Sequence, residues 1–178
     1  FCFRLGNVIM FLEVFYLTQF HNIPPLYDEN SNILILGSFP SVKSRKQGFY
    51  YGHPQNRFWR VVSVVFGCET PLTISEKKAF LLSNGIALWD VIATCSIEGS
   101  SDSSIENAVP NDIGIILRSC PIRRIFTNGT ASSELYRKLI YPLTGIESVR
   151  LPSTSPANAS WPLDKLIAAW RLLIQVQS

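Results

Sequence analysis

The sequence predicts an α/β protein, a three-layer α/β/α sandwich built around a central four-stranded parallel sheet. Short runs of almost wholly apolar residues, such as Ile33-Leu34-Ile35-Leu36, recur along the chain. Such runs are typical of strands buried on both faces. They alternate with segments that carry helical periodicity and helix-capping residues, and this alternation favours a parallel sheet covered by helices on both sides.

The four strands are expected at residues 33–36, 86–89, 124–127 and 148–151. The helices are expected at residues 57–66, 74–82, 113–118, 130–139 and 163–176. Asn56 and Asn111 are candidate N-caps, and Thr73 with Glu76 forms a capping-box pattern. The segment 37–56, rich in Gly and Pro, and the Ser-rich segment 92–109 are expected to be irregular loops on one rim of the sheet.

Length and composition predict a single domain at residues 24–178, preceded by an apolar extension of uncertain role at residues 1–23. The extension contains Glu13 within a run too short to cross a bilayer, and it has no small-residue cleavage site. We therefore expect a docked or poorly ordered segment and no membrane partner. The expected location is cytoplasmic, associated with the nucleoid in a bacterium or archaeon, or nuclear in a eukaryote.

The net charge of +3 permits a nucleic-acid partner without arguing for one. The cysteines lie far apart in the sequence, none forms a CxxC pair, and the chain has only two histidines. This pattern predicts neither a zinc site nor an iron–sulfur cluster, and scattered thiols suit a reducing compartment. The cysteines are Cys2, Cys68, Cys95 and Cys120.

Small or polar residues follow each predicted strand, where ligands bind in open α/β sheets. The loop after the first strand also places aromatic residues beside Lys43, Arg45 and Lys46, which suits a stacked base and a phosphate. Strand ends are often polar without any function, so the pattern alone leaves both interpretations open. Neither a GxSxG elbow nor a GxxxxGK[ST] phosphate loop occurs in the sequence.

The segments GSFPS, FYYGHPQNRFW and LPSTSPAN together resemble the uracil-DNA glycosylase superfamily, over residues 24 to the end of the last helix. The sequence is most similar to the hypoxanthine-DNA (deoxyinosine) glycosylase family, and HPxNRFW is also similar to mismatch-specific uracil-DNA glycosylases. The resemblance implies a monofunctional enzyme, without metal or cofactor, that removes hypoxanthine from deoxyinosine in DNA and leaves an abasic site. We expect a monomer whose partner is DNA containing deaminated bases.

The resemblance implies that Asn56 holds the hydrolytic water. The mismatch-specific relatives carry an Asn two residues after the first Gly of their first motif, where this chain has Phe39. The deoxyinosine glycosylase family instead uses the Asn of HPQN, which is Asn56 here. A role for Asn56 as a helix cap alone stays open, and the two roles can coexist.

Further residues are expected to bind the everted base. Tyr51 matches the aromatic residue that stacks on the base in the mismatch-specific relatives, although it can equally pack on the core. Asp90 can accept the N1–H of hypoxanthine, which adenine lacks, and Asn128 can reach O6 or N7; a loop contact and a turn are their alternatives. The same base-binding group includes Gly37, Ser38 and Phe39.

The segment 151–158 occupies the place of the superfamily's second motif, which enters the minor groove and contacts a phosphate. The residues expected to contact DNA are Lys43, Arg45, Ser153, Thr154, Ser155 and Asn158. A stiff connection before the last helix and a solvated loop face are the alternatives. Three other functions stay open: a glycosylase for uracil or mismatches, a non-catalytic nucleic-acid-binding module of the same fold, and a small-molecule hydrolase.

Overall fold

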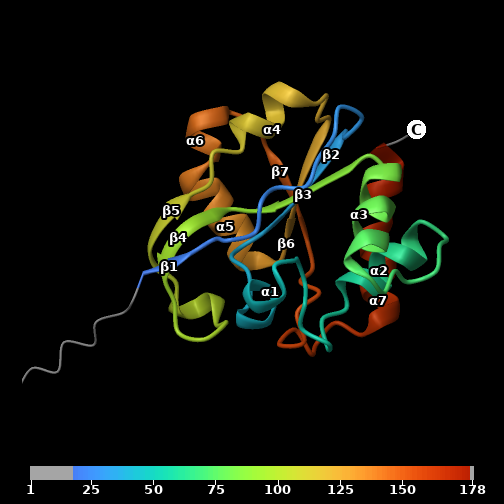
Figure 1. Cartoon of the computed structure of the whole chain (residues 1–178), viewed down its shortest axis with the longest axis horizontal. Helices are drawn as coiled ribbons and strands as arrows, with labels where there is room; N and C mark the ends of the chain where they lie inside the picture. The colour runs from blue at the N-terminus through green and yellow to red at the C-terminus, as the bar shows by residue number, and fades with distance from the viewer. Residues whose placement is uncertain (1–17, 177–178) are drawn as a thin grey trace, which may run out of the picture.

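The computed structural model describes residues 18–176, and it confirms the predicted parallel sheet with helices on both faces (Figure 1). The sheet has the strand order β3-β2-β6-β7, and all neighbouring strands are parallel. Its strands are β2 (Ile33–Gly37), β3 (Ile86–Asp90), β6 (Arg124–Asn128) and β7 (Ser148–Leu151). Every residue of β2 and β3 is buried, which explains why both strands are continuous apolar runs.

The sheet register brings the carboxyl ends of these strands together. Gly37 pairs with Asp90 across β2 and β3, and Asn128 pairs with Leu151 across β6 and β7. The residues that end the strands therefore share one edge of the sheet, as the sequence predicts.

The helices that cover the sheet lie in two groups in Figure 1, with α2, α3 and α7 on one side and α5 and α6 on the other. Their bounds are α1 (Val42–Gln47), α2 (Phe58–Val65), α3 (Ile74–Ser83), α4 (Gly114–Ser119), α5 (Thr130–Leu139), α6 (Tyr141–Thr144) and α7 (Leu163–Trp170). Trp170 of α7 packs edge-on against Phe58 of α2, with 5.7 Å between their ring centroids. This contact ties the last helix to the start of α2, directly beside Asn56.

The capping box predicted for α3 is present. The N–H of Glu76 donates to the hydroxyl of Thr73 at 3.2 Å, and the Glu76 carboxylate accepts the N–H of Thr73 at 2.9 Å. Asn111 does not cap α4, contrary to the prediction. Its amide instead donates to the carbonyls of Asp90 and Ile92 at 2.9 and 3.0 Å, which anchors the end of β3.

The two predicted loops contain regular structure that the sequence analysis missed. The Ser-rich segment forms β4 (Ile92–Ser96), the short 3₁₀ turn η1 (Asp102–Ser104) and β5 (Glu106–Pro110). The strands β4 and β5 join β1 (Gln19–Phe20) in a second, antiparallel sheet with the order β1-β4-β5. The helix α1 lies inside the loop after β2, because Ser41 caps its start and Gly48, at φ 68°, ends it.

The last helix also differs from the prediction, since α7 ends at Trp170 and continues as the 3₁₀ turn η2 (Arg171–Val176). At the other end of the chain, residues 19–23 pack against the domain, so a boundary at residue 24 does not separate two structural units. Most of the predicted apolar extension lies outside the described residues. Within residues 18–176, no helix is both long enough and apolar enough to span a bilayer.

Candidate active site

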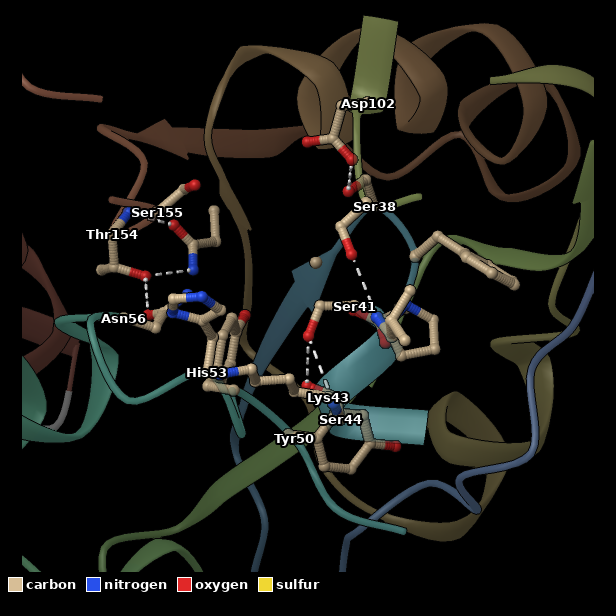
Figure 2. Close-up of a pocket in the computed structure, with 18 of the residues that line it drawn as sticks. Ser38, Ser41, Lys43, Ser44, Tyr50, His53, Asn56, Asp102, Thr154 and Ser155 are labelled. Atoms are coloured by element: carbon tan, nitrogen blue, oxygen red, sulfur yellow. Dashed lines mark hydrogen bonds between the residues drawn. The ribbon is translucent and has the colours of Figure 1, made fainter. Parts of the chain in front are cut away.

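A cavity of about 600 Å³ lies at the carboxyl edge of the parallel sheet (Figure 2). Gly37, Asp90 and Asn128 contribute from three strand ends, Asn56 from the loop before α2, and residues 153–157 from the turn after β7. Figure 2 shows Asn56, Thr154 and Ser155 on one side of the cavity, with Ser38 and Asp102 at a separate part of its rim. The fold therefore brings the HPQN loop and the Pro-Ser-Thr-Ser-Pro turn into one site.

Most of the predicted site residues line this cavity. These residues are Gly37, Ser38, Phe39, Lys43, Tyr51, Asn56, Asp90, Asn128, Ser153, Thr154 and Ser155. Asn158 lines a neighbouring cavity instead, where its amide donates to the carbonyl of Ser153 at 2.9 Å. Arg45 lines neither of these two cavities.

The amide oxygen of Asn56 is fully engaged within the protein. It accepts the backbone N–H of Phe58 at 2.9 Å and the hydroxyl of Thr154 at 3.0 Å. The first contact satisfies the free N–H of Phe58 at the start of α2, but the N-cap position is Arg57 and not Asn56, contrary to the prediction. Because both lone pairs of this oxygen are occupied, the amide N–H₂ is the group of Asn56 that is left to serve the cavity.

Thr154 connects Asn56 to the end of β6. Its hydroxyl accepts from the amide of Asn128 at 3.0 Å, and its backbone N–H donates to the amide oxygen of Asn128 at 3.0 Å. Thr154 is 0% exposed, and these bonds use both its hydroxyl and its N–H. In this structure Thr154 joins three segments of the site in a hydrogen-bonded chain, while its contact with DNA stays a prediction.

Arg57 is a site residue that the sequence analysis missed. One of its terminal nitrogens donates to the carbonyls of Ser155 and Asn158 at 2.7 and 3.0 Å, and the other donates to the carbonyl of Trp161. Its backbone N–H donates to the carbonyl of Thr154 at 3.1 Å. The turn after β7 has few backbone bonds of its own, so the planar guanidinium supplies donors that hold its shape. A charged residue directly after the proposed catalytic Asn was the available signal.

Tyr51 stacks on Phe58, with 3.9 Å between the ring centroids and 17° between the ring planes. Phe58 covers one face of the ring, so only the opposite face is available to a base in the cavity. The backbone of Tyr51 has φ 51°, which is uncommon for a residue with a side chain and often marks a functional site. Burial, together with the nearby carboxylate of Asp90, raises the pKa of the Tyr51 phenol. The hydroxyl is therefore protonated and buried; within residues 18–176 it has no close hydrogen-bond partner, although the nearby side chain of Asn128 acts to lower its pKa.

Asp90 forms the floor of the cavity with Gly37. A Cβ added to Gly37 would overlap Oδ1 of Asp90, so only glycine leaves room for this carboxylate. The other oxygen, Oδ2, lies 2.8 Å from Nε2 of His21, and the two side chains are 6% and 2% exposed. His21 was missed because it falls in the segment that the sequence analysis set apart from the domain.

The cations near the cavity have different surroundings. Arg45 is turned inward, since its guanidinium donates to the carbonyl of Pro40 at 2.6 Å and lies 5.3 Å from the ring centroid of Phe39. Burial lowers the pKa of Arg45. The contact of Arg45 with phosphate stays a prediction, whereas Lys43 and Lys46 are exposed and line the cavity.

Ser38 takes part in the rim rather than in the floor of the cavity. Its hydroxyl donates to the carboxylate of Asp102 at 2.6 Å, and the hydroxyl of Ser100 accepts the N–H of Val42 at 3.0 Å. These contacts hold the η1 segment against the start of α1. Among residues 18–176, no group of three His, Cys, Asp or Glu side chains is placed to hold a metal ion.

The fold and the site together define an α/β/α protein with a base-sized crevice at the carboxyl edge of a parallel sheet. A family model described as the uracil DNA glycosylase superfamily matches residues 24–174, and the chain belongs to this superfamily.

Two curated relatives are named hypoxanthine DNA glycosylase. The protein from Methanosarcina acetivorans is 42% identical over 76% of this chain and 85% of its own length. The protein from Methanosarcina barkeri is 36% identical over the same shares of the two chains. A solution NMR structure from M. acetivorans, described as a candidate uracil DNA glycosylase, has a TM-score of 0.71 and 37% identity, and the match covers 85% of this chain and 96% of that one.

Proposed function

We propose that this protein is a monofunctional DNA glycosylase that hydrolyses the N-glycosidic bond of deoxyinosine, releases hypoxanthine and leaves an abasic site. The observation that carries the proposal is the hydrogen-bonded chain from Asn128 through Thr154 to Asn56, inside a cavity that also contains Asp90. The names of two relatives, each covered over 85% of its length, support the same activity.

The cavity has the size of an ordinary small-molecule site, since such sites span roughly 300–1,000 Å³. Because C1′ of a nucleotide is inaccessible inside a duplex, the enzyme must extrude the nucleotide into this space. The free face of Tyr51 is placed to stack on the extruded base, opposite the face that Phe58 covers. The exposed Lys43 and Lys46 at the rim are suited to neighbouring phosphates.

In the proposed reaction, the bond between C1′ and N9 breaks first, and its electron pair leaves with the purine. The sugar becomes oxocarbenium-like, and a neutral water attacks such a cation without needing a strong base. The amide N–H₂ of Asn56 holds that water by one lone pair and leaves the other directed at C1′. The water then loses its proton to solvent, and the departing purine anion takes one proton up from solvent, so that neutral hypoxanthine is released. Asn56 contributes by positioning, since an amide cannot take up the proton itself.

The departing purine gains negative charge, which nearby donors must stabilise. Asn128 keeps a second amide hydrogen beyond the one that it gives to Thr154. We assign this group to the base, together with the backbone N–H groups at Gly37 and Ser38.

Recognition of hypoxanthine is assigned to Asp90. A carboxylate accepts the N1–H of hypoxanthine, whereas N1 of adenine carries no hydrogen and would face the carboxylate with a lone pair. Burial sharpens this discrimination, because a buried acceptor facing another acceptor is strongly unfavourable. The same carboxylate could accept the N3–H of uracil, so the uracil glycosylase alternative stays testable.

The test uses matched duplexes that carry a single inosine, uracil, xanthine or adenine, followed by alkaline cleavage of abasic sites. We expect strand breaks at inosine, none at adenine, and loss of the breaks in Asn56→Ala with DNA affinity retained. Gln55→Ala is the matched control, because Gln55 is the exposed neighbour of Asn56.

Breaks at uracil alone would replace the proposal with the uracil or mismatch alternative. Binding to all duplexes without any break would indicate a non-catalytic module. If Asn56→Ala cleaved inosine as fast as the parent protein, Asn56 would lose its assigned role while the activity would stand.

A further inference from the structure

The imidazole of His21 lies directly behind Asp90, outside the lining of the cavity. It is enclosed by the rings of Phe39, Tyr50 and Trp89, with centroid distances of 6.0 to 6.3 Å. His21 precedes residues 24–174, the part of the chain that the family model matches. A segment outside the matched domain therefore supplies a buried polar side chain to the floor of the site.

The hydrogen bonds of His21 define its tautomer. Nδ1 lies 3.3 Å from the backbone nitrogen of Ile23 and accepts its N–H, so Nδ1 carries no hydrogen. Nε2 must then carry the proton of a neutral imidazole, and it donates that proton to Oδ2 of Asp90 at 2.8 Å. The pair is a neutral donor facing a carboxylate.

This contact leaves one carboxylate oxygen of Asp90 committed and the other available. Oδ2 is held by His21, while Oδ1 lies against Gly37, whose missing side chain provides the space. The hydroxyl of Tyr51 lies 3.5 Å from the position that a Cβ of Gly37 would occupy. The backbone carbonyl of Asp90 is held separately by Asn111 at 2.9 Å. Asp90 is thus fixed at both its backbone and its side chain.

The position of the imidazole is itself anchored by a short strand. Gln19 and Phe20 of β1 pair with Cys95 and Thr94 of β4, and the N–H of His21 donates to the carbonyl of Ala93 at 2.8 Å. The strand β4 begins at Ile92, a single residue after Asp90 at the end of β3, so the strand that pairs with β1 directly continues the strand that carries Asp90. The histidine therefore cannot shift without disturbing that sheet.

We propose that His21 is a positioning residue for base recognition, which holds Asp90 in the one orientation that presents Oδ1 to the N1–H of the everted base. This inference rests on the proposed function, because it requires that Asp90 reads the base. A buried carboxylate without this donor would turn toward other partners, since burying an unpaired charge is unfavourable. Of the rings around His21, Phe39 has no donor, and the hydroxyl of Tyr50 is already committed to the carbonyl of Pro24 at 2.8 Å. The indole N–H of Trp89 makes no hydrogen bond to Asp90 within residues 18–176.

The experiment compares His21→Leu with His21→Gln in the full chain. The amide nitrogen of Gln can reach roughly where Nε2 stands and can still donate to Asp90, whereas Leu cannot. We expect His21→Leu to slow single-turnover excision of hypoxanthine about 10- to 100-fold, the value of one hydrogen bond to a charged group. His21→Gln should recover to within about threefold of the parent rate, and DNA affinity should be unchanged in both. Thr18→Ala, an exposed position before β1, is the matched control.

Action through Asp90 is tested by combining His21→Leu with Asp90→Asn. If the two residues act as a unit, the double variant should be no slower than Asp90→Asn alone. Independent effects that multiply, or equal losses in His21→Leu and His21→Gln, would overturn the proposal and leave His21 with a packing role only.

Failure of the proposed function can be recognised separately, because the parent protein itself would then leave inosine intact. If His21→Leu does not fold, the comparison of His21→Gln with His21→Asn replaces it. The shorter Asn keeps an amide but cannot reach Oδ2, so equal rates for these two variants would also refute the inference.

Discussion

Thr154→Val tests the hydrogen-bonded chain at the centre of the site. The change keeps the shape of the side chain and removes the hydroxyl that lies between Asn56 and Asn128. One amide hydrogen of Asn128 then loses its acceptor, and the amide oxygen of Asn56 loses one of two donors. Each unsatisfied buried group costs about 1–3 kcal/mol. Because water in the adjoining cavity can reach both amides, we expect about 1 kcal/mol for each of the two groups. The free energy of unfolding should therefore fall by about 2 kcal/mol in total.

The same change should slow catalysis, since the Asn56 amide would keep only its contact with the N–H of Phe58 and could rotate. We expect a fall of about 10- to 100-fold in the single-turnover rate, with little change in DNA affinity. Thr154→Ser is the control, because it keeps the hydroxyl and loses a methyl group worth about 0.8 kcal/mol. Urea unfolding and excision from an inosine duplex measure the two effects. If Thr154→Val and Thr154→Ser had the same free energy of unfolding and the same excision rate, the hydrogen bonds of Thr154 would have no role in holding Asn56.

Three further changes test other contacts of the site. Arg57→Lys should keep the fold but slow single-turnover excision by up to about 100-fold, because one ammonium group cannot bond the several carbonyls of the turn. A rate within twofold of the parent rate would contradict this. Gly37→Ala should displace the carboxylate of Asp90 and lower the free energy of unfolding by about 1–3 kcal/mol, as measured by urea unfolding. It should also reduce the preference for inosine over adenine in the excision assay. An unchanged preference would refute the close approach of Asp90 Oδ1 to Gly37. Tyr51→Phe should leave the free energy of unfolding unchanged or slightly raised, since the hydroxyl has no close hydrogen-bond partner within residues 18–176, and should keep excision near the parent rate because the stacking ring is retained; a large loss of single-turnover excision would contradict stacking as its role. Burial raises the pKa of Tyr51, so above about pH 10 the unfolded chain ionises this phenol while the folded protein keeps it protonated; the free energy of unfolding should therefore fall above about pH 10, and fall less in Tyr51→Phe, as denaturation at graded pH should show.

The parallel sheet could be predicted because its strands are buried on both faces and so appear as continuous apolar runs. The same logic located the site, since Gly37, Asp90 and Asn128 end strands whose register is shared. The antiparallel sheet could not be predicted in this way. Its strands β4 and β5 are only partly buried and include exposed polar residues, so they lack a continuous apolar run.

The roles of single polar residues were harder to predict than the location of the site. Thr154 and Arg45 are both suited by type to contact phosphate, but Thr154 is turned toward the protein by its long-range partner Asn128, and Arg45 by the nearby carbonyl of Pro40. His21 carries no local signal for its role, and Arg57 carries only its position after Asn56, because their acceptors lie 69 and about 100 positions away in sequence. Such contacts depend on tertiary structure that a pattern of residue types does not contain.

The adjacency of Asn56 and Arg57 restricts how the length of this part of the chain can vary. The first residue holds Thr154 by its side chain, and the second holds the following carbonyls of the same turn. One residue inserted between them would separate the two contacts by roughly 3.5 Å of additional chain, so Asn56 and Arg57 could no longer hold adjacent parts of the same turn without a shift of the start of α2. Additional residues in the exposed connection at 98–103 would leave both contacts in place.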